Sequence, residues 1–166
     1  MNTFTAIALS SVITLTAYSA AVTQGSAQAE PVQQPQQVVI SLTEKLQSAD
    51  LTERRELLRA QVEKSARTHG ANTEQIYATI AKCENKEIDP KQQSGHVYDF
   101  NSEKRGIVKG EREKSFGLAM IHLPDHPDIS YSQATDPEFA IDWMASEFAA
   151  GRQNQWTCYR ILFGAK

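Results

Sequence analysis

The sequence predicts a mainly helical domain with one disulfide and one long irregular segment. Capping residues and apolar side chains at helical spacing recur along the chain and indicate several short helices. The chain has two cysteines, and residues 85–106 are interrupted by proline and glycine. A loop of that length in a small domain is usually functional, or it contains a small hairpin, here with strands over residues 97–100 and 107–108.

Capping residues mark the starts of the expected helices, because their side chains bond backbone N–H groups that the first turn leaves free. These capping residues are Ser41, Asp50, Asn72 and Asp136. Ser41 and Glu44 form a capping box, Gly70 ends the second helix, and Pro137 occupies the first position of a later one. A short helix over residues 156–163 follows near the end of the sequence.

Residues 1–29 have the features of a signal peptide. They contain no charged side chain, the stretch 4–22 is apolar or small, and Ala27-Gln28-Ala29 provides a cleavage motif. The alternative is an uncleaved membrane anchor, but threonine and serine make this stretch a poor bilayer span. We therefore expect secretion or export to the periplasm and cell envelope, with no stable membrane insertion after cleavage.

The remaining sequence divides into three parts. Residues 30–40 are rich in proline and glutamine and predict a linker, and residues 41–70 predict an N-terminal helical segment. That segment is a lid, a spacer or the first part of the domain that residues 71–166 form. The net charge of −3 argues against nucleic-acid binding, and we expect a monomer. Residues 103–114 look basic, but Glu103, Glu111 and Glu113 neutralise them and predict a solvated loop.

Two cysteines in an exported protein predict one disulfide, Cys83–Cys158. A nucleophilic thiol would need a histidine base nearby, and a zinc site would need further cysteine or histidine at ligand spacing. His122 and His126 have the spacing of a helical metal site. However, Pro124 and Pro127 argue against a helix there, and no third ligand is evident. We therefore expect no metal and no cofactor.

Glu84 is the candidate catalytic acid. It follows Cys83 at the end of the helix that Asn72 begins, and Ile76, Ile80 and Cys83 form one apolar stripe of that helix. Glu84 lies about 100° further around the helix, at the margin of the stripe. A carboxylate there is partly removed from water and still reaches a cleft, whereas the usual alternative is a glutamate on the helix surface.

Three segments stand out by their order and spacing. They are Ile80-Ala81-Lys82-Cys83-Glu84-Asn85, Ser115-Phe116-Gly117-Leu118-Ala119-Met120-Ile121 and Cys158-Tyr159. Together they resemble the lysozyme-like superfamily, specifically small secreted lytic transglycosylases of the SLT type, over residues 72–164. The resemblance implies a lysozyme-like α+β fold, mainly helical, with the irregular loop or hairpin beside a cleft. Met120 stands where the family has glutamine, and His122 can replace part of the lost polarity.

The resemblance implies that Glu84 cleaves the β-1,4 bond between N-acetylmuramic acid and N-acetylglucosamine in peptidoglycan glycan strands. One glutamate serves as acid and then as base, and the product has a 1,6-anhydro end. The implied substrate-binding residues are Ser115, Met120, His122 and Tyr159. Capping of a turn is the alternative role for Ser115, and core packing is the alternative for Tyr159.

Other functions stay open. A muramidase-type hydrolase would need a second carboxylate, for which Asp99 and Asp125 are candidates. A non-catalytic glycan-binding protein on the same scaffold is favoured by Met120 and disfavoured by the intact Glu84. A third possibility is a helical interaction module built on residues 41–69.

Overall fold

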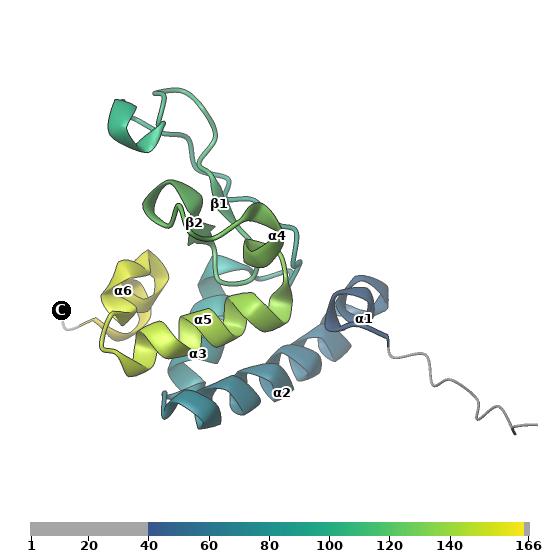
Figure 1. The fold of residues 1–166 in the computed structure, drawn as a ribbon. Coiled ribbons are helices and arrows are strands. Elements are labelled where there is room, and N and C mark those ends of the chain that lie inside the picture. Colours follow the sequence, from purple (N-terminus) through teal and green to yellow (C-terminus); the bar gives the residue numbers. More distant parts are fainter. Residues whose placement is uncertain (1–39, 165–166) are drawn as a thin grey trace, which may run out of the picture. The chain divides into compact units, whose positions relative to one another are not determined.

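The computed structural model describes residues 40–164; the expected signal peptide (1–29) and residues 30–39 of the expected linker lie outside them. The α-helices are Leu42–Ser48 (α1), Leu51–His69 (α2), Thr73–Thr79 (α3), Tyr131–Ala134 (α4), Pro137–Ala149 (α5) and Thr157–Phe163 (α6) (Figure 1). Shorter elements are Ile80–Glu84 (η1), Glu103–Arg105 (η2), Ser115–Phe116 (β1), Ile121–His122 (β2), Leu123–Asp125 (η3) and Gln153–Gln155 (η4). The described part of the chain is therefore mainly helical, as predicted. Over these residues, no helix has the length and apolar character needed to cross a membrane.

The capping residues occupy their predicted positions. The side chains of Ser41, Asp50, Asn72 and Asp136 accept hydrogen bonds from the first turns of α1, α2, α3 and α5. Ser41 and Glu44 complete a capping box, and Gly70 ends α2 in the left-handed conformation with φ of 73°. These helix starts are therefore confirmed. The sequence could predict them because each depends only on residues within one helical turn of each other.

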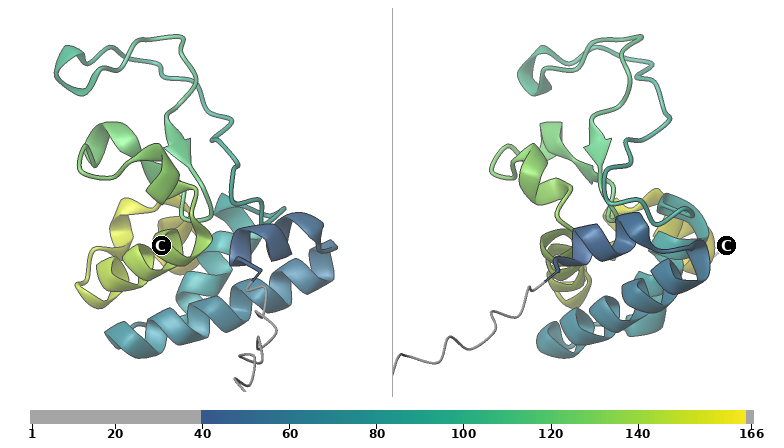
Figure 2. Two further views of the ribbon diagram at one scale, coloured as in Figure 1. Left: turned by 45° about the vertical axis from the view of Figure 1, so that its right-hand side comes forward. Right: turned by 90° about the vertical axis from the view of Figure 1, so that its right-hand side faces the viewer.

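The N-terminal helices belong to the same hydrophobic core as the rest of the described chain. α2 packs along α5, and α1 contacts both (Figure 2). Leu46 of α1 and Leu58 and Val62 of α2 are fully buried in one cluster with Ile141 and Met144 of α5. Full burial of such a side chain stabilises the fold by about 2 kcal/mol relative to its exposure. Of the three alternatives for the N-terminal segment, the structure supports the first part of the domain.

The helix that carries Glu84 changes type before it ends. α3 is a regular helix, but η1 is a π-helical turn, closed by a hydrogen bond from the Asn85 N–H to the Ile80 carbonyl at 2.9 Å. A π turn contains more residues than an α turn, so the expected 100° step around a regular helix does not describe Glu84. Ile76 and Ile80 are fully buried as predicted, and Cys83 and Glu84 are half-buried at the margin.

The long segment after Glu84 folds back on itself in antiparallel fashion, as predicted, but in another register: Val97 pairs with Arg112, and Ser102 pairs with Ile107. The Tyr98 N–H bonds the Glu111 carbonyl, and the Gly110 N–H bonds the Tyr98 carbonyl, both at 2.9 Å. Strand residues expected at 97–100 thus pair with the chain around residue 111, and not with 107–108. Residues 95–114 form an extension that projects away from the helices (Figures 1 and 2). The sheet of the described chain is β1–β2, antiparallel, and it lies at the base of this extension.

The predicted disulfide Cys83–Cys158 is confirmed. It joins η1 to α6 with 5.7 Å between the two Cα atoms, and it links positions 75 residues apart. α6 also packs against α3 and η1, so the last helix lies beside the end of the helix that carries Glu84 (Figure 1).

Candidate active site

A cavity of about 640 Å³ opens beside the end of η1. Its walls come from η1, from the β1–β2 region, from both ends of the extension and from α6. Residues of the wall include Glu84, Glu113, Ser115, Met120, His122 and Ile161. Sites for small ligands are usually clefts of roughly 300–1,000 Å³. This cavity, which we call the Glu84 cavity, is therefore large enough to hold part of a glycan strand.

Glu84 is half-buried in this wall, and its Oε1 accepts a hydrogen bond from the Cys158 N–H at 3.3 Å. Burial removes water from the carboxylate and raises the pKa of Glu84 above its ordinary value of 4.5. The Cys158 N–H works in the opposite direction, and the negative charge of Glu113 adds to the increase in pKa. A carboxyl group that keeps its proton to higher pH is suited to general acid catalysis. The one backbone donor then stabilises the carboxylate that remains after the proton is given up.

Glu113 is a functional candidate that the sequence reasoning missed, because its charge was assigned to a solvated loop. Its carboxylate accepts a hydrogen bond from the Ser94 hydroxyl at 2.7 Å, and its side chain lines the Glu84 cavity. Asp99 and Asp125, the expected second carboxylates, line a neighbouring cavity instead. The carboxylate that faces Glu84 is therefore Glu113. The signal available in the sequence was that Glu113 lies two residues before Ser115, the first residue of the segment that resembles the cleft lining of the family.

The turn between β1 and β2 is fixed to the end of the acid's helix. Asn85 is fully buried and donates from Nδ2 to the carbonyls of Asp89 at 2.7 Å and Gly117 at 3.2 Å. Gly117 has φ of 78°, and a Cβ added there would lie 1.8 Å from the Ala134 carbonyl oxygen, so only glycine fits. The residue after Glu84 thus holds the turn that carries Met120 against the cavity.

Met120 lies in the cavity wall, at the position that the resemblance associates with substrate. Its backbone has φ of 46°, which few residues other than glycine adopt. Backbone strain of this kind costs on the order of 1 kcal/mol and persists only where the surrounding structure holds it. Here the hydrogen bond from Asn85 to the Gly117 carbonyl holds the turn between β1 and β2 and supplies that support.

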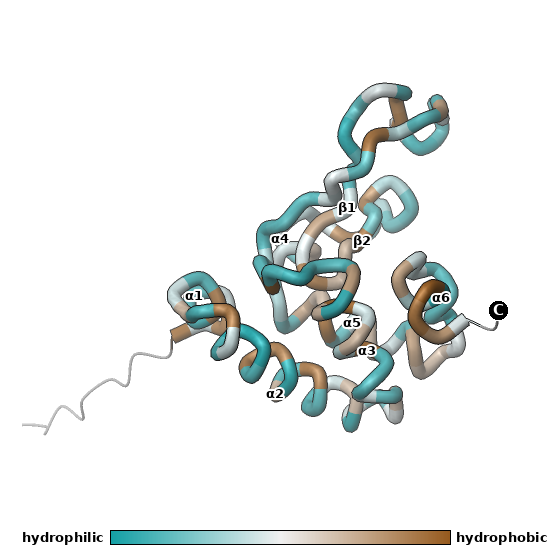
Figure 3. Tube along the Cα trace, turned by 180° about the vertical axis from the view of Figure 1, so that it is seen from behind, coloured by the Kyte–Doolittle hydropathy of each residue, from teal (hydrophilic) through white to brown (hydrophobic). Residues whose placement is uncertain are grey.

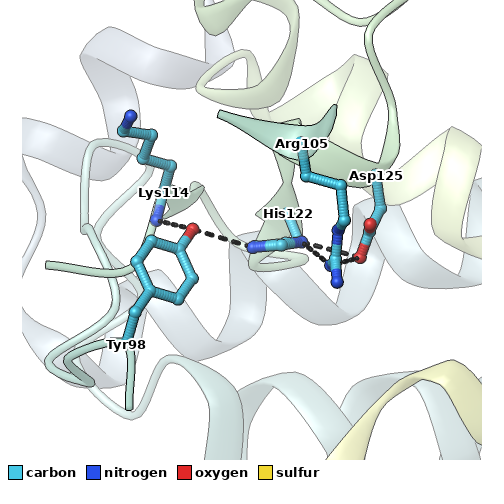
Figure 4. A network of polar contacts seen from close by, with 5 residues as sticks. All are labelled: Tyr98, Arg105, Lys114, His122 and Asp125. Atoms are coloured by element: carbon cyan, nitrogen blue, oxygen red, sulfur yellow. Dashed lines mark hydrogen bonds and ion pairs between the residues drawn. The ribbon is translucent and has the colours of Figure 1, made fainter. Parts of the chain in front are cut away.

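His122 is held by protein groups on both ring nitrogens (Figure 4). Nε2 lies 2.8 Å from the Tyr98 hydroxyl, and Nδ1 lies 2.8 Å from Oδ2 of Asp125, which also accepts from Arg105 at 2.6 Å. The Tyr98 hydroxyl accepts from the Lys114 N–H at 2.9 Å, so its own proton points to Nε2. The proton of a neutral His122 is therefore on Nδ1, where it donates to Asp125.

Asp125 is the anionic end of this network. Partial burial acts to raise its pKa, but the hydrogen bond from His122 and the charges of His122 and Arg105 outweigh burial and hold the pKa below its ordinary value of 3.8. Asp125 is thus an ionised partner of His122 and not a proton donor. His122 lines the Glu84 cavity as expected, yet its nitrogens serve to position Tyr98 and the extension.

Two further expected site residues have a different setting. Ser115 lines the cavity from β1, where its carbonyl accepts from the Ser94 N–H at 2.9 Å, and it does not begin a turn. Tyr159 is buried in the core, with its ring 5.3 Å from that of Phe148 and 5.4 Å from that of Phe163. The structure supports core packing for Tyr159, and its contact with substrate stays a prediction. Among residues 40–164, no group of three or more histidine, cysteine, aspartate or glutamate side chains is arranged to hold a metal ion.

Comparisons with known proteins leave the family of this chain open. No protein-family model, no curated protein and no solved structure matches it. The lysozyme-like assignment is therefore a proposal that depends on the residues and the geometry described above.

Proposed function

We propose that this protein is an exported peptidoglycan-cleaving enzyme of the lytic transglycosylase type on a lysozyme-like scaffold. The observation that carries the proposal is Glu84, a half-buried carboxyl group with a raised pKa in the wall of a cavity of about 640 Å³. The order of three features along the chain supports the same scaffold. These are the acid Glu84, the turn that bears Met120, and the last helix, which the disulfide joins to η1. Its partner is the glycan strand of peptidoglycan.

In the proposed reaction, the protonated Glu84 gives its proton to the oxygen of the β-1,4 bond that leaves N-acetylmuramic acid. The C1–O bond breaks, and the carboxylate of Glu84 then takes the proton of the C6 hydroxyl of the same sugar. That oxygen bonds C1 and closes a 1,6-anhydro ring, so no water is consumed. Burial keeps the acid protonated for the first step, and the Cys158 N–H stabilises the carboxylate needed in the second.

Glu113 favours a second candidate, a muramidase-type hydrolase. Hydrolysis without a covalent intermediate uses one carboxylic acid and one carboxylate that activates water. Glu84 and Glu113 line one cavity and supply such a pair of side chains. In this mechanism Glu113 takes a proton from water, which attacks C1 and leaves a reducing end.

Mass spectrometry of fragments released from purified peptidoglycan separates these functions. The mature chain is compared with Glu84→Gln and Glu113→Gln, which keep the shape of each side chain and remove its acid. A lytic transglycosylase releases 1,6-anhydro ends, loses this activity in Glu84→Gln and retains most of it in Glu113→Gln. A hydrolase releases reducing ends and depends on both residues.

Met120 favours one non-catalytic function, a glycan-binding protein, because an apolar side chain stands where the family presents a hydrogen-bonding glutamine. The same experiment addresses it. Binding to peptidoglycan without release of fragments, unchanged in Glu84→Gln, would replace the enzymatic proposal with this one.

A further inference from the structure

A second cavity of about 350 Å³ lies between the extension and the β2 region. It shares His96, Glu113, His122 and Gln155 with the Glu84 cavity, so the two cavities adjoin, and we call them together the groove. The residues that belong to the second cavity and not to the first are mainly Tyr98, Asp99, Phe100, Arg105 and Asp125. Three of them lie in the extension before η2, which makes the extension one wall of the groove.

The network around His122 fixes that wall in place. Tyr98 is buried, and its hydroxyl joins the Lys114 N–H to His122 at distances of 2.9 and 2.8 Å. Arg105 reaches from the far part of the extension to Asp125 at 2.6 Å (Figure 4). The extension is thus bonded at two points, to His122 of β2 and to Asp125 of η3, although it projects from the helices in both views of Figure 2.

Phe100 gives this groove an apolar surface. Its side chain is 44% exposed. Its ring centre lies 6.1 Å from that of Tyr98, in a T-shaped arrangement, and 5.9 Å from the guanidinium carbon of Arg105. Polar residues make up much of the extension, with apolar stretches between them (Figure 3), and Val97 of the same wall is also exposed. An exposed aromatic ring in a mostly polar groove offers a flat face for one side of a sugar ring, whose C–H groups are apolar.

The polar groups around Phe100 suit the hydroxyl groups of a neutral sugar. Asp99 and Asp125 accept hydrogen bonds, and Arg105 has a buried Nε without a hydrogen-bond partner among the described residues. The wall of the second cavity carries three carboxylates, Asp99, Glu113 and Asp125, and one guanidinium, which disfavours an anionic ligand. A neutral ring with several hydroxyl groups matches this pattern better than a phosphate or a free carboxylate.

We propose that the extension forms a second saccharide-binding subsite, centred on Phe100 and Arg105, for a neutral N-acetylhexosamine unit further along the strand cut at Glu84. The subsite depends on the proposed function for its substrate class. It accounts for the position of His122, which acts as a positioning residue of the groove. It also predicts that longer oligosaccharides bind more tightly than short ones.

The test is calorimetric binding of β-1,4-linked N-acetylglucosamine oligosaccharides to the Glu84→Gln protein, which binds without cutting. The disaccharide and the hexasaccharide are compared in this background with Phe100→Ala, Phe100→Trp and Val108→Ala. Val108 is the matched control, since it is 49% exposed on the same extension and lies outside the wall of the groove. Phe100→Trp keeps a flat ring.

Phe100→Ala is expected to weaken hexasaccharide binding roughly tenfold, the size expected for loss of one apolar ring face, and to leave disaccharide binding unchanged. Phe100→Trp and Val108→Ala should retain the affinity for the hexasaccharide. An unchanged hexasaccharide affinity in Phe100→Ala overturns the subsite and leaves the proposed function intact, as does an equal loss for both lengths. If neither oligosaccharide binds the Glu84→Gln protein, the subsite is overturned, whereas the proposed function is decided by the fragments released from peptidoglycan.

Discussion

Removal of the Cys83–Cys158 disulfide is the perturbation whose size follows most directly from the structure. The bond links positions 75 residues apart, and it therefore restricts the unfolded chain more than the folded one. The chain-entropy relation for such a loop gives about 15 cal/mol/K, or about 4.5 kcal/mol at 25 °C. Since whole domains are stable by only about 5–15 kcal/mol, the double variant Cys83→Ala/Cys158→Ala should lose a large share of its free energy of unfolding.

Urea unfolding followed by far-ultraviolet circular dichroism measures this loss. The wild-type protein under reducing conditions serves as a control, because it breaks the same bond without a substitution. For a domain of this size, the loss also corresponds to a fall in the melting temperature of roughly 15 °C. The double variant and the reduced wild-type protein should show the same loss of unfolding free energy and the same fall in melting temperature.

A loss below about 1 kcal/mol in the double variant would contradict this reasoning. It would mean that the loop between the cysteines is already restricted in the unfolded chain, or that the bond strains the folded one. If the variant loses about 4.5 kcal/mol and reduction of the wild-type protein has no effect, the packing of the two cysteine side chains, and not the bond between them, carries the stability.

Three further predictions concern the site. Gly117→Ala should destabilise the fold by about 3 kcal/mol in urea unfolding, because its Cβ meets the Ala134 carbonyl and its φ is positive; Gly106→Ala, with positive φ but open space, should lose only about 1 kcal/mol. Asn85→Ala should cost about 2 kcal/mol in the same assay, since buried carbonyls lose their donor, and an unchanged stability would refute that role. The raised pKa of Glu84 means that folding disfavours its ionised form, so its contribution to stability is fully present below pH 4.5 and is lost as the pH rises through the folded pKa. Glu84→Gln should therefore gain stability relative to wild type as the pH rises across that window, and a difference independent of pH would show that burial does not raise this pKa.

Several features of the fold were predictable because they depend on near neighbours. Asp50 caps α2 through the N–H groups of Thr52 and Glu53, and Gly70 ends the same helix through its own backbone freedom. The pairing of the two cysteines followed from their number. These signals lie within one helical turn or within the composition, so the sequence carries them without reference to the fold.

The candidate acid was predictable in identity but not in setting. Its place beside Cys83 and after an apolar stripe pointed to Glu84, yet nothing in those local patterns indicated that Glu84 ends a π turn that packs against α6. Glu113 escaped notice because its neighbours in sequence are charged, while its partner Ser94 lies 19 residues away. Tyr159 matched a motif, but core packing with Phe148 and Phe163 determines its surroundings.

The sequence by itself therefore determined the helix starts, the disulfide and the candidate acid of this protein. The tertiary structure alone decided which carboxylate faces Glu84, how the extension pairs with itself, and why His122 positions neighbouring groups. The physical reason is that burial, pKa and hydrogen-bond partners depend on distances between segments remote in the chain. Local patterns specify where elements begin, and packing of those elements specifies what each side chain meets.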